Sequence, residues 1–103
     1  ILGSLTTSTQ GTTVMAVNNW YLMCATNAGG SASKTYLNGV LEASSSIYTP
    51  NTSNTILTIG SSGRSASINK FTGDISQAKL YLRELSAGEI LQIYNVQKSR
   101  YGL

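Results

Sequence analysis

The side chains that could perform chemistry in this chain are few. There is no histidine, and the acidic residues are Asp74, Glu42, Glu84 and Glu89. Glycoside hydrolysis needs two carboxyl groups that face each other across the scissile bond. Glu42 lies at the end of a predicted hairpin, Glu84 precedes a predicted helix, and Glu89 has the position of a helix-capping residue. Because this pattern indicates no facing pair, we expect a protein that is not an enzyme.

Metal and nucleophile chemistry also lack their usual groups. Transition-metal sites are built mainly from His and Cys, and the single cysteine is Cys24. It lies in the apolar run of residues 20–25, where a thiol is expected to pack as a small hydrophobe. Asp74 could bind Ca²⁺, but this ion prefers several carboxylates and carbonyls. We therefore predict no cofactor, with calcium at Asp74 as the weaker alternative.

Sugar binding requires no ionisable residue, because an aromatic ring and a few amide or hydroxyl groups are sufficient. Two polar loops, residues 44–54 and 61–69, carry such side chains. The candidate ligand-binding residues are Tyr48, Asn51, Asn54 and Arg64, and the alternative is that they are ordinary solvated loop residues. Residues 51–53 also form a glycosylation sequon, and Trp20 is expected in the core.

Composition and charge indicate a folded domain and limit the kinds of partner that the chain is expected to bind. The chain has 103 residues, 41% of them hydrophobic and 11% charged, which favours a folded, β-rich domain over a disordered one. The net charge is +3, but the basic residues are scattered singly, so we predict no nucleic-acid partner. The apolar runs are too short for a membrane span, and the first residues do not resemble a secretory leader.

The sequence pattern predicts short strands followed by one helix. Asn38-Gly39 between apolar residues is typical of a tight hairpin, here over residues 33–43. Ser86 followed by Glu89 predicts a capping box and a helix over Ala87 to Val96. The other predicted strands are residues 14–17, the two-sided apolar segment 20–26, residues 55–60, and the longest, residues 71–83, with a β-bulge near Ser76 and Gln77.

In this order and spacing, the segments between residues 17 and 96 resemble the C-terminal half of the concanavalin A-like lectin/glucanase superfamily, in its laminin-G-like branch. The matching pieces include residues 19–26, 34–41, 57–60, 71–81 and 85–90. The resemblance implies an all-β fold, an antiparallel jelly-roll β-sandwich with one short C-terminal helix. Residues 94–103 also resemble the close of such domains in tailed-bacteriophage virion proteins.

The resemblance further implies one domain, residues 1–103, that is incomplete at its N-terminal side. Either an N-terminal portion is missing, or another chain covers the exposed sheet edge. The function that we expect is a non-enzymatic structural or binding module of a virus particle: a capsid-decoration, head-fibre or tail-associated protein. Its partners would be other virion chains in a homo- or hetero-oligomer, with cell-surface glycan as a further candidate.

Two other functions stay open at this point. One is a carbohydrate-binding module of a secreted bacterial glycosidase or adhesin, which would be extracellular. The other is that the chain is itself a glycosidase, and this requires a carboxylate pair that the sequence does not indicate.

Overall fold

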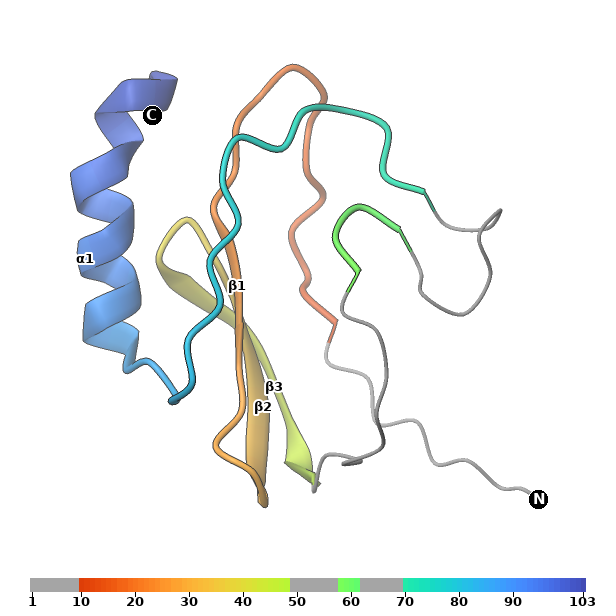
Figure 1. The fold of residues 1–103 in the computed structure, drawn as a ribbon, viewed down its shortest axis with the longest axis vertical. Coiled ribbons are helices and arrows are strands. Elements are labelled where there is room, and N and C mark those ends of the chain that lie inside the picture. The colour runs from red at the N-terminus through yellow and green to blue at the C-terminus, as the bar shows by residue number, and fades with distance from the viewer. Residues whose placement is uncertain (1–9, 49–57, 62–69) are drawn as a thin grey trace. The chain divides into compact units, whose positions relative to one another are not determined.

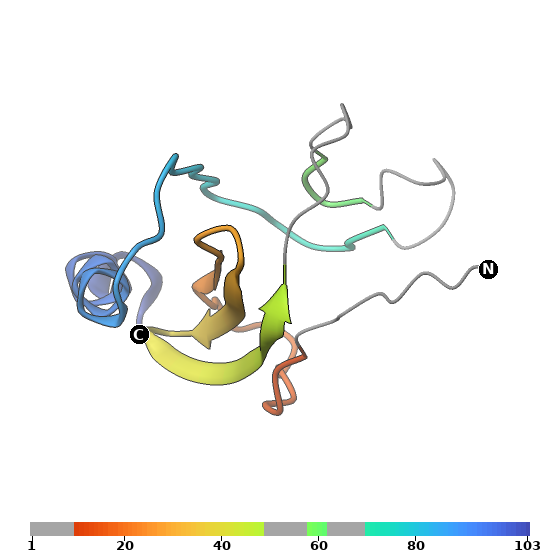
Figure 2. The same ribbon diagram turned by 90° about the horizontal axis from the view of Figure 1, so that it is seen from below.

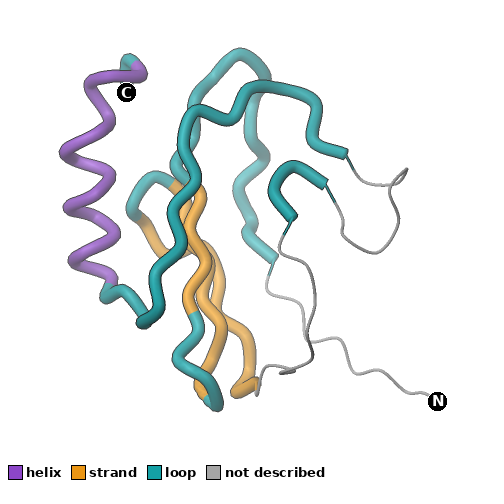
Figure 3. Tube along the Cα trace, in the orientation of Figure 1, coloured by secondary structure: helices purple, strands orange, loops and turns teal. Residues whose placement is uncertain are grey.

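The structure is a computed structural model that describes residues 10–48, 58–61 and 70–103. The strands are β1 (Met23–Thr26), β2 (Ser31–Leu37) and β3 (Val40–Tyr48), followed by the helix α1 (Ala87–Gln97) and the 3-10 helix η1 (Lys98–Tyr101) (Figure 1). The chain divides into two compact units, residues 1–50 with 83–103, and residues 51–82. All the named strands and helices belong to the first unit (Figure 3).

The three strands form one antiparallel sheet in the order β1-β2-β3. Met23 pairs with Leu37, and Leu37 pairs with Val40 on its other side. The β2–β3 register shifts twice, between Ala32 and Lys34 and between Thr35 and Tyr36. Such irregularities bend a strand, and Figure 2 shows the resulting strong curvature of β3.

The predicted hairpin is confirmed, but its strands run from Ser31 to Tyr48, so residues 44–48 belong to β3 and not to the predicted polar loop. Its turn also joins the sheet to the helix. Asn38 (φ 50°) and Gly39 (φ 83°) are both in the left-handed region, as a type I′ turn requires. The Leu22 N–H donates to Asn38 Oδ1, and the Asn38 N–H donates to the Leu22 carbonyl, both at 2.9 Å. Gly39 lies directly under α1, because a Cβ there would be 3.2 Å from the Cα of Leu91.

The described core is small and lies between the sheet and α1. Its buried residues are Tyr36 on β2, Leu85 just before the helix, and Ile90 on α1, with Cys24 and Ile93 packed against them. Cys24 is therefore a packed small hydrophobe, as the sequence predicted. Its partial burial raises the pKa of the thiol.

The helix begins as predicted and extends one residue further, to Gln97. Ser86 Oγ accepts the Glu89 N–H at 3.1 Å, and Glu89 Oε2 accepts the Ser86 N–H at 2.8 Å, so the capping box is complete. The Arg83 guanidinium donates to both carboxylate oxygens of Glu89 at 2.9 Å. The Arg83 hydrogen bonds and the Ser86 N–H together lower the pKa of Glu89 from about 4.5 to about 2.

This arrangement predicts an acid-sensitive helix start. A carboxyl group with a lower pKa in the folded state adds stability above its unfolded pKa, and loses it as the pH falls to the folded value. We expect the free energy of unfolding to decrease between about pH 4.5 and pH 2. In Glu89→Gln the Glu89 share of this decrease should vanish, and urea unfolding across that pH range measures it. An unchanged pH profile in Glu89→Gln would show that the ionised carboxylate of Glu89 contributes nothing to the acid sensitivity.

Two predicted strands are wrong in the described residues. Residues 14–17 and 71–83 are not in strands. A strand exists only where its backbone groups pair with a neighbour, and the sequence pattern of one segment does not supply that neighbour. Residues 58–60 are also outside strands, while residues 55–57 lie outside the described residues.

The second unit has a few local contacts of its own among residues 58–61 and 70–82. Ser61 and Lys70 form an isolated antiparallel bridge, and the Phe71 N–H donates to the Gly60 carbonyl at 2.8 Å. Thr58 Oγ1 donates to the Ser61 carbonyl at 2.9 Å. These bonds hold a tight turn around Gly60, whose φ is 78°.

The expectation for Trp20 is also wrong. The strand that it was expected to begin starts only at Met23, and Trp20 is 38% exposed. Its ring lies against Tyr101 of η1, with centroids 5.2 Å apart and planes at 48°. Met23 is 67% exposed, and β1 is an edge of the described sheet, so the apolar pattern of residues 20–26 does not produce a strand covered on both sides here.

Candidate functional site

Tyr48 is the one predicted ligand-binding residue that the structure describes. It is the last residue of β3, and its backbone pairs with Ser31, the first residue of β2. Tyr48 therefore lies at the end of the sheet where the β1–β2 turn is found. Asn51, Asn54 and Arg64 lie outside the described residues, as does the sequon at residues 51–53.

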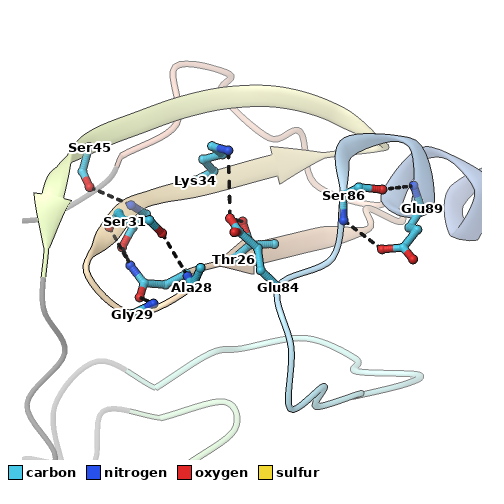
Figure 4. A network of polar contacts seen from close by, with 11 residues as sticks. Thr26, Ala28, Gly29, Ser31, Lys34, Ser45, Glu84, Ser86 and Glu89 are labelled. Carbon is cyan, nitrogen blue, oxygen red and sulfur yellow. Dashed lines mark hydrogen bonds and ion pairs between the residues drawn. The ribbon is translucent and has the colours of Figure 1, made fainter.

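The β1–β2 turn at this end, with Ala28, Gly29 and Ser31 labelled in Figure 4, is organised by Asn27. Asn27 Oδ1 accepts the Gly29 N–H at 2.7 Å, and Asn27 Nδ2 donates to the Ser31 carbonyl at 3.1 Å and to Ser33 Oγ at 2.9 Å. An asparagine that bonds the backbone two residues ahead is typical of an Asx-turn. Gly29 and Gly30 have φ values near 72°, with open space around both.

Serine hydroxyls extend this network across the sheet. Ser31 Oγ accepts the Ala28 N–H, and Ser45 Oγ on β3 accepts the Ser33 N–H, each at 3.1 Å. We call Asn27, Ser31, Ser33, Ser45 and the backbone of Tyr48 the polar sheet end. The sequence signal for it was the turn at residues 27–31, but the prediction did not include these serines or Asn27 among the ligand-binding residues.

A charged cluster lies beside the polar sheet end. Glu84 Oε1 accepts the Thr26 hydroxyl hydrogen at 3.3 Å and lies 3.9 Å from Lys34 Nζ (Figure 4). Thr26 is buried and Lys34 is half-buried, so this contact fastens the segment before α1 to the sheet. Its chemistry is that of a structural ion pair.

Glu42 has a structural role of a different kind. Its carboxylate accepts the N–H groups of Thr12 and Thr13, at 3.0 and 2.9 Å, and the hydroxyls of the same two residues. These bonds attach the segment before β1 to β3. Hydrogen bonding to Thr13, and then to Thr12, lowers the pKa of Glu42.

The three glutamates therefore serve three separate contacts: Glu42 holds Thr12 and Thr13, Glu84 holds Thr26 and Lys34, and Glu89 caps α1. Asp74 is exposed in the second unit. Within the described ranges, no three His, Cys, Asp or Glu side chains are grouped so that they could hold a metal ion. The prediction of no cofactor, with calcium at Asp74 as the weaker alternative, stays untested.

Comparison with known proteins identifies the family. The family model described as the concanavalin A-like lectin/glucanases superfamily matches residues 3–91. The chain belongs to this superfamily. The fold class that the resemblance implied is therefore confirmed, and the described part contains its antiparallel sheet and short C-terminal helix.

A crystal structure of an S-layer domain-containing protein from Clostridium thermocellum has a similar fold. The TM-score is 0.68 with 21% sequence identity, over 82% of this chain and 43% of that chain. The chain thus spans less than half of the solved structure that it matches. No curated protein matches the chain. Among the described residues, none of the helices has the length and apolar character needed to span a membrane.

Proposed function

We propose that the chain is a non-enzymatic binding module. The observation that carries this proposal is the use of its glutamates, because each of the three is engaged in holding the fold together. A catalytic carboxyl pair must instead face a substrate. The superfamily is named for both lectins and glucanases, so membership is compatible with a binding module and with an enzyme. The roles of the acidic side chains are what distinguish the two.

The setting that we propose is a virus particle, in which the module binds neighbouring virion chains as part of a homo- or hetero-oligomer. The support is the resemblance of residues 94–103 to the close of such domains in tailed-bacteriophage virion proteins. The complete reading frame and its neighbouring genes test this setting. Structural genes of a virus beside it would support the proposal, and genes for secreted polysaccharide-degrading enzymes would contradict it.

The ligand-binding groups that we propose are those of the polar sheet end, and the residues expected from the sequence, Tyr48, Asn51, Asn54 and Arg64, remain separate candidates. Hydroxyl and amide groups converge there, and a tyrosine ring can pack against the apolar face of a sugar. Each polar group of a sugar needs such a partner, because a buried unpaired hydroxyl is costly.

A glycan-array screen tests this surface. We expect at least one glycan to bind, and Tyr48→Ala and Arg64→Ala to weaken it about tenfold each, which corresponds to the loss of one ring contact or one charged hydrogen bond. Arg100→Ala, on η1, is the matched control and should bind as the parent does. Absence of any binding, or equal binding by all variants, would contradict the proposed surface.

The second candidate is an extracellular carbohydrate-binding module of a bacterial glycosidase or adhesin. The observation that favours it is the fold shared with a bacterial S-layer domain-containing protein. Both candidates place the same glycan surface on the module, and the gene neighbourhood separates them.

A further inference from the structure

Asn38 is the one asparagine in the sequence that precedes a glycine. In water, an asparagine in this position loses its side-chain amide more readily than one before any other residue, because glycine has no side chain to hinder its own backbone nitrogen. That nitrogen attacks Cγ of the asparagine, and a five-membered succinimide ring forms as ammonia leaves. Asn38-Gly39 is therefore a candidate site of covalent modification, and the fold around it decides whether the ring can form.

The reaction consumes only water. The bond from Asn38 Cγ to the Gly39 nitrogen forms, the bond from Cγ to Nδ2 breaks, and the proton of the Gly39 N–H passes through solvent to the departing ammonia. Water then opens the ring at either of its two carbonyl groups. One product is aspartate. The other is isoaspartate, in which the main chain runs through Cβ and Cγ and is one atom longer.

The folded hairpin holds the reacting groups apart. The Leu22 N–H donates to Asn38 Oδ1, and the Asn38 N–H donates to the Leu22 carbonyl, both at 2.9 Å. The first of these bonds fixes the carbonyl group whose carbon, Cγ, has to reach the Gly39 nitrogen. Ring formation therefore requires this bond to break. It also requires the peptide between Asn38 and Gly39 to rotate out of its position in the type I′ turn, where φ is 50° and 83°.

The helix α1 hinders that rotation, because the turn lies beside it (Figure 1). A Cβ on Gly39 would be 3.2 Å from both Leu91 Cα and Tyr94 Cβ, and 3.0 Å from Leu91 Cδ1. The glycine thus has little free space on the side of the helix. Leu22, the turn and α1 all belong to the first compact unit. The turn can rotate only when α1 moves away from the hairpin.

We infer that Asn38 is a site of spontaneous deamidation that the folded protein keeps closed and that separation of α1 from the hairpin opens. The rate of such a reaction follows the fraction of molecules in which the contact is open. The change is irreversible. Isoaspartate does not fit a two-residue turn whose flanking residues, Leu37 and Val40, are paired, so a molecule modified in this way loses the contact between hairpin and helix.

The test follows deamidation of the whole chain in mildly alkaline buffer, with and without urea. Peptide mass spectrometry after proteolysis identifies each asparagine that has exchanged its amide for a carboxyl group. In the unfolded chain, we expect Asn38 to react faster than every other asparagine. In the folded chain its rate should be at least about tenfold lower, which corresponds to the free energy of breaking the Leu22 bonds and the helix contact.

A variant of α1 tests the role of the helix. Leu91 is 44% exposed, so Leu91→Ala should still fold, but it lacks the side chain that contacts Gly39. We expect Asn38 to react about fivefold faster in this folded variant than in the parent. Val96→Ala is the matched control, because Val96 is on the same helix and is 71% exposed. Its rate should stay within about twofold of the parent rate. In urea all three chains should react equally.

The two products test the consequence for the fold. In Asn38→Asp the carboxylate can still accept the Leu22 N–H, so we expect urea unfolding close to that of the parent. The isoaspartate form, purified from chain aged in urea and then refolded, should unfold at a lower urea concentration than Asn38→Asp.

Four results would overturn the inference. They are equal rates at Asn38 in the folded and unfolded parent, equal rates in folded Leu91→Ala and Val96→Ala, faster reaction of another asparagine in the unfolded chain, and equal urea unfolding of the isoaspartate form and Asn38→Asp. The second result would show that α1 does not control access to the site even if the hairpin does.

Discussion

Replacement of Gly39 by alanine is expected to destabilise the protein by about 3 kcal/mol. Two effects add at this position. The φ of 83° is a conformation that L-residues rarely adopt, and the new Cβ would lie 3.0 Å from Leu91 Cδ1 and 3.2 Å from Leu91 Cα. The nearest side-chain atom can move, but the helix backbone can do so only if α1 shifts away from the hairpin. The midpoint of urea unfolding measures the loss.

Gly29 supplies the matched control, because it has a similar φ of 73° but nothing within 4 Å of its Cβ position. Gly29→Ala should therefore lower the free energy of unfolding by only about 1 kcal/mol, which is the cost of an L-residue at this φ. Equal losses for the two variants would show that the contact between the hairpin turn and α1 contributes nothing to stability.

Ile90→Ala is expected to have an effect of the same size, also about 3 kcal/mol. Ile90 is 0% exposed and packs with Tyr36 and Leu85, the other buried apolar residues of the described core. Truncation removes buried methyl groups and leaves a cavity that the helix and sheet can close only in part. Urea unfolding again measures the change.

The control for this prediction is on the same helix. Val96 is 71% exposed, so Val96→Ala should change the free energy of unfolding by no more than about 0.5 kcal/mol. A similarly small loss of unfolding free energy in Ile90→Ala would contradict a core that lies between α1 and the sheet.

The elements that could be predicted from the sequence are those with local causes. The Asn38-Gly39 turn requires only two residues that accept positive φ, and the start of α1 requires only Ser86 and Glu89. Each signal is complete within a few neighbouring residues. The family resemblance was also correct, because it depended on the order of several such signals along the chain.

The errors have a non-local cause. Residues 71–83 have the composition of a strand, but a strand also needs a paired neighbour, which the described part of the chain does not provide. Trp20 has an apolar sequence context, but its contact is Tyr101, at the other end of the chain. Sequence periodicity describes which residues could share a face and does not say what covers that face.

The four candidate ligand-binding residues stay an untested prediction. Tyr48 was expected on a polar loop, but it is the last residue of β3, where its register partner Ser31 belongs to a polar turn. Asn27, Ser33 and Ser45 were not predicted as ligand residues, because they come from three elements and their proximity depends on the strand register. The Asx-turn pattern around Asn27 was the one available signal.

The central claim is that the module binds glycans without cleaving them. The most direct measurement is mass analysis of each glycan that the protein binds, after incubation with the protein. The account predicts that each bound glycan is recovered intact, and that Glu42→Gln binds the same glycans as the parent. Recovery of cleaved glycans from the parent, together with loss of cleavage in Glu42→Gln, would contradict it and make the chain a glycosidase.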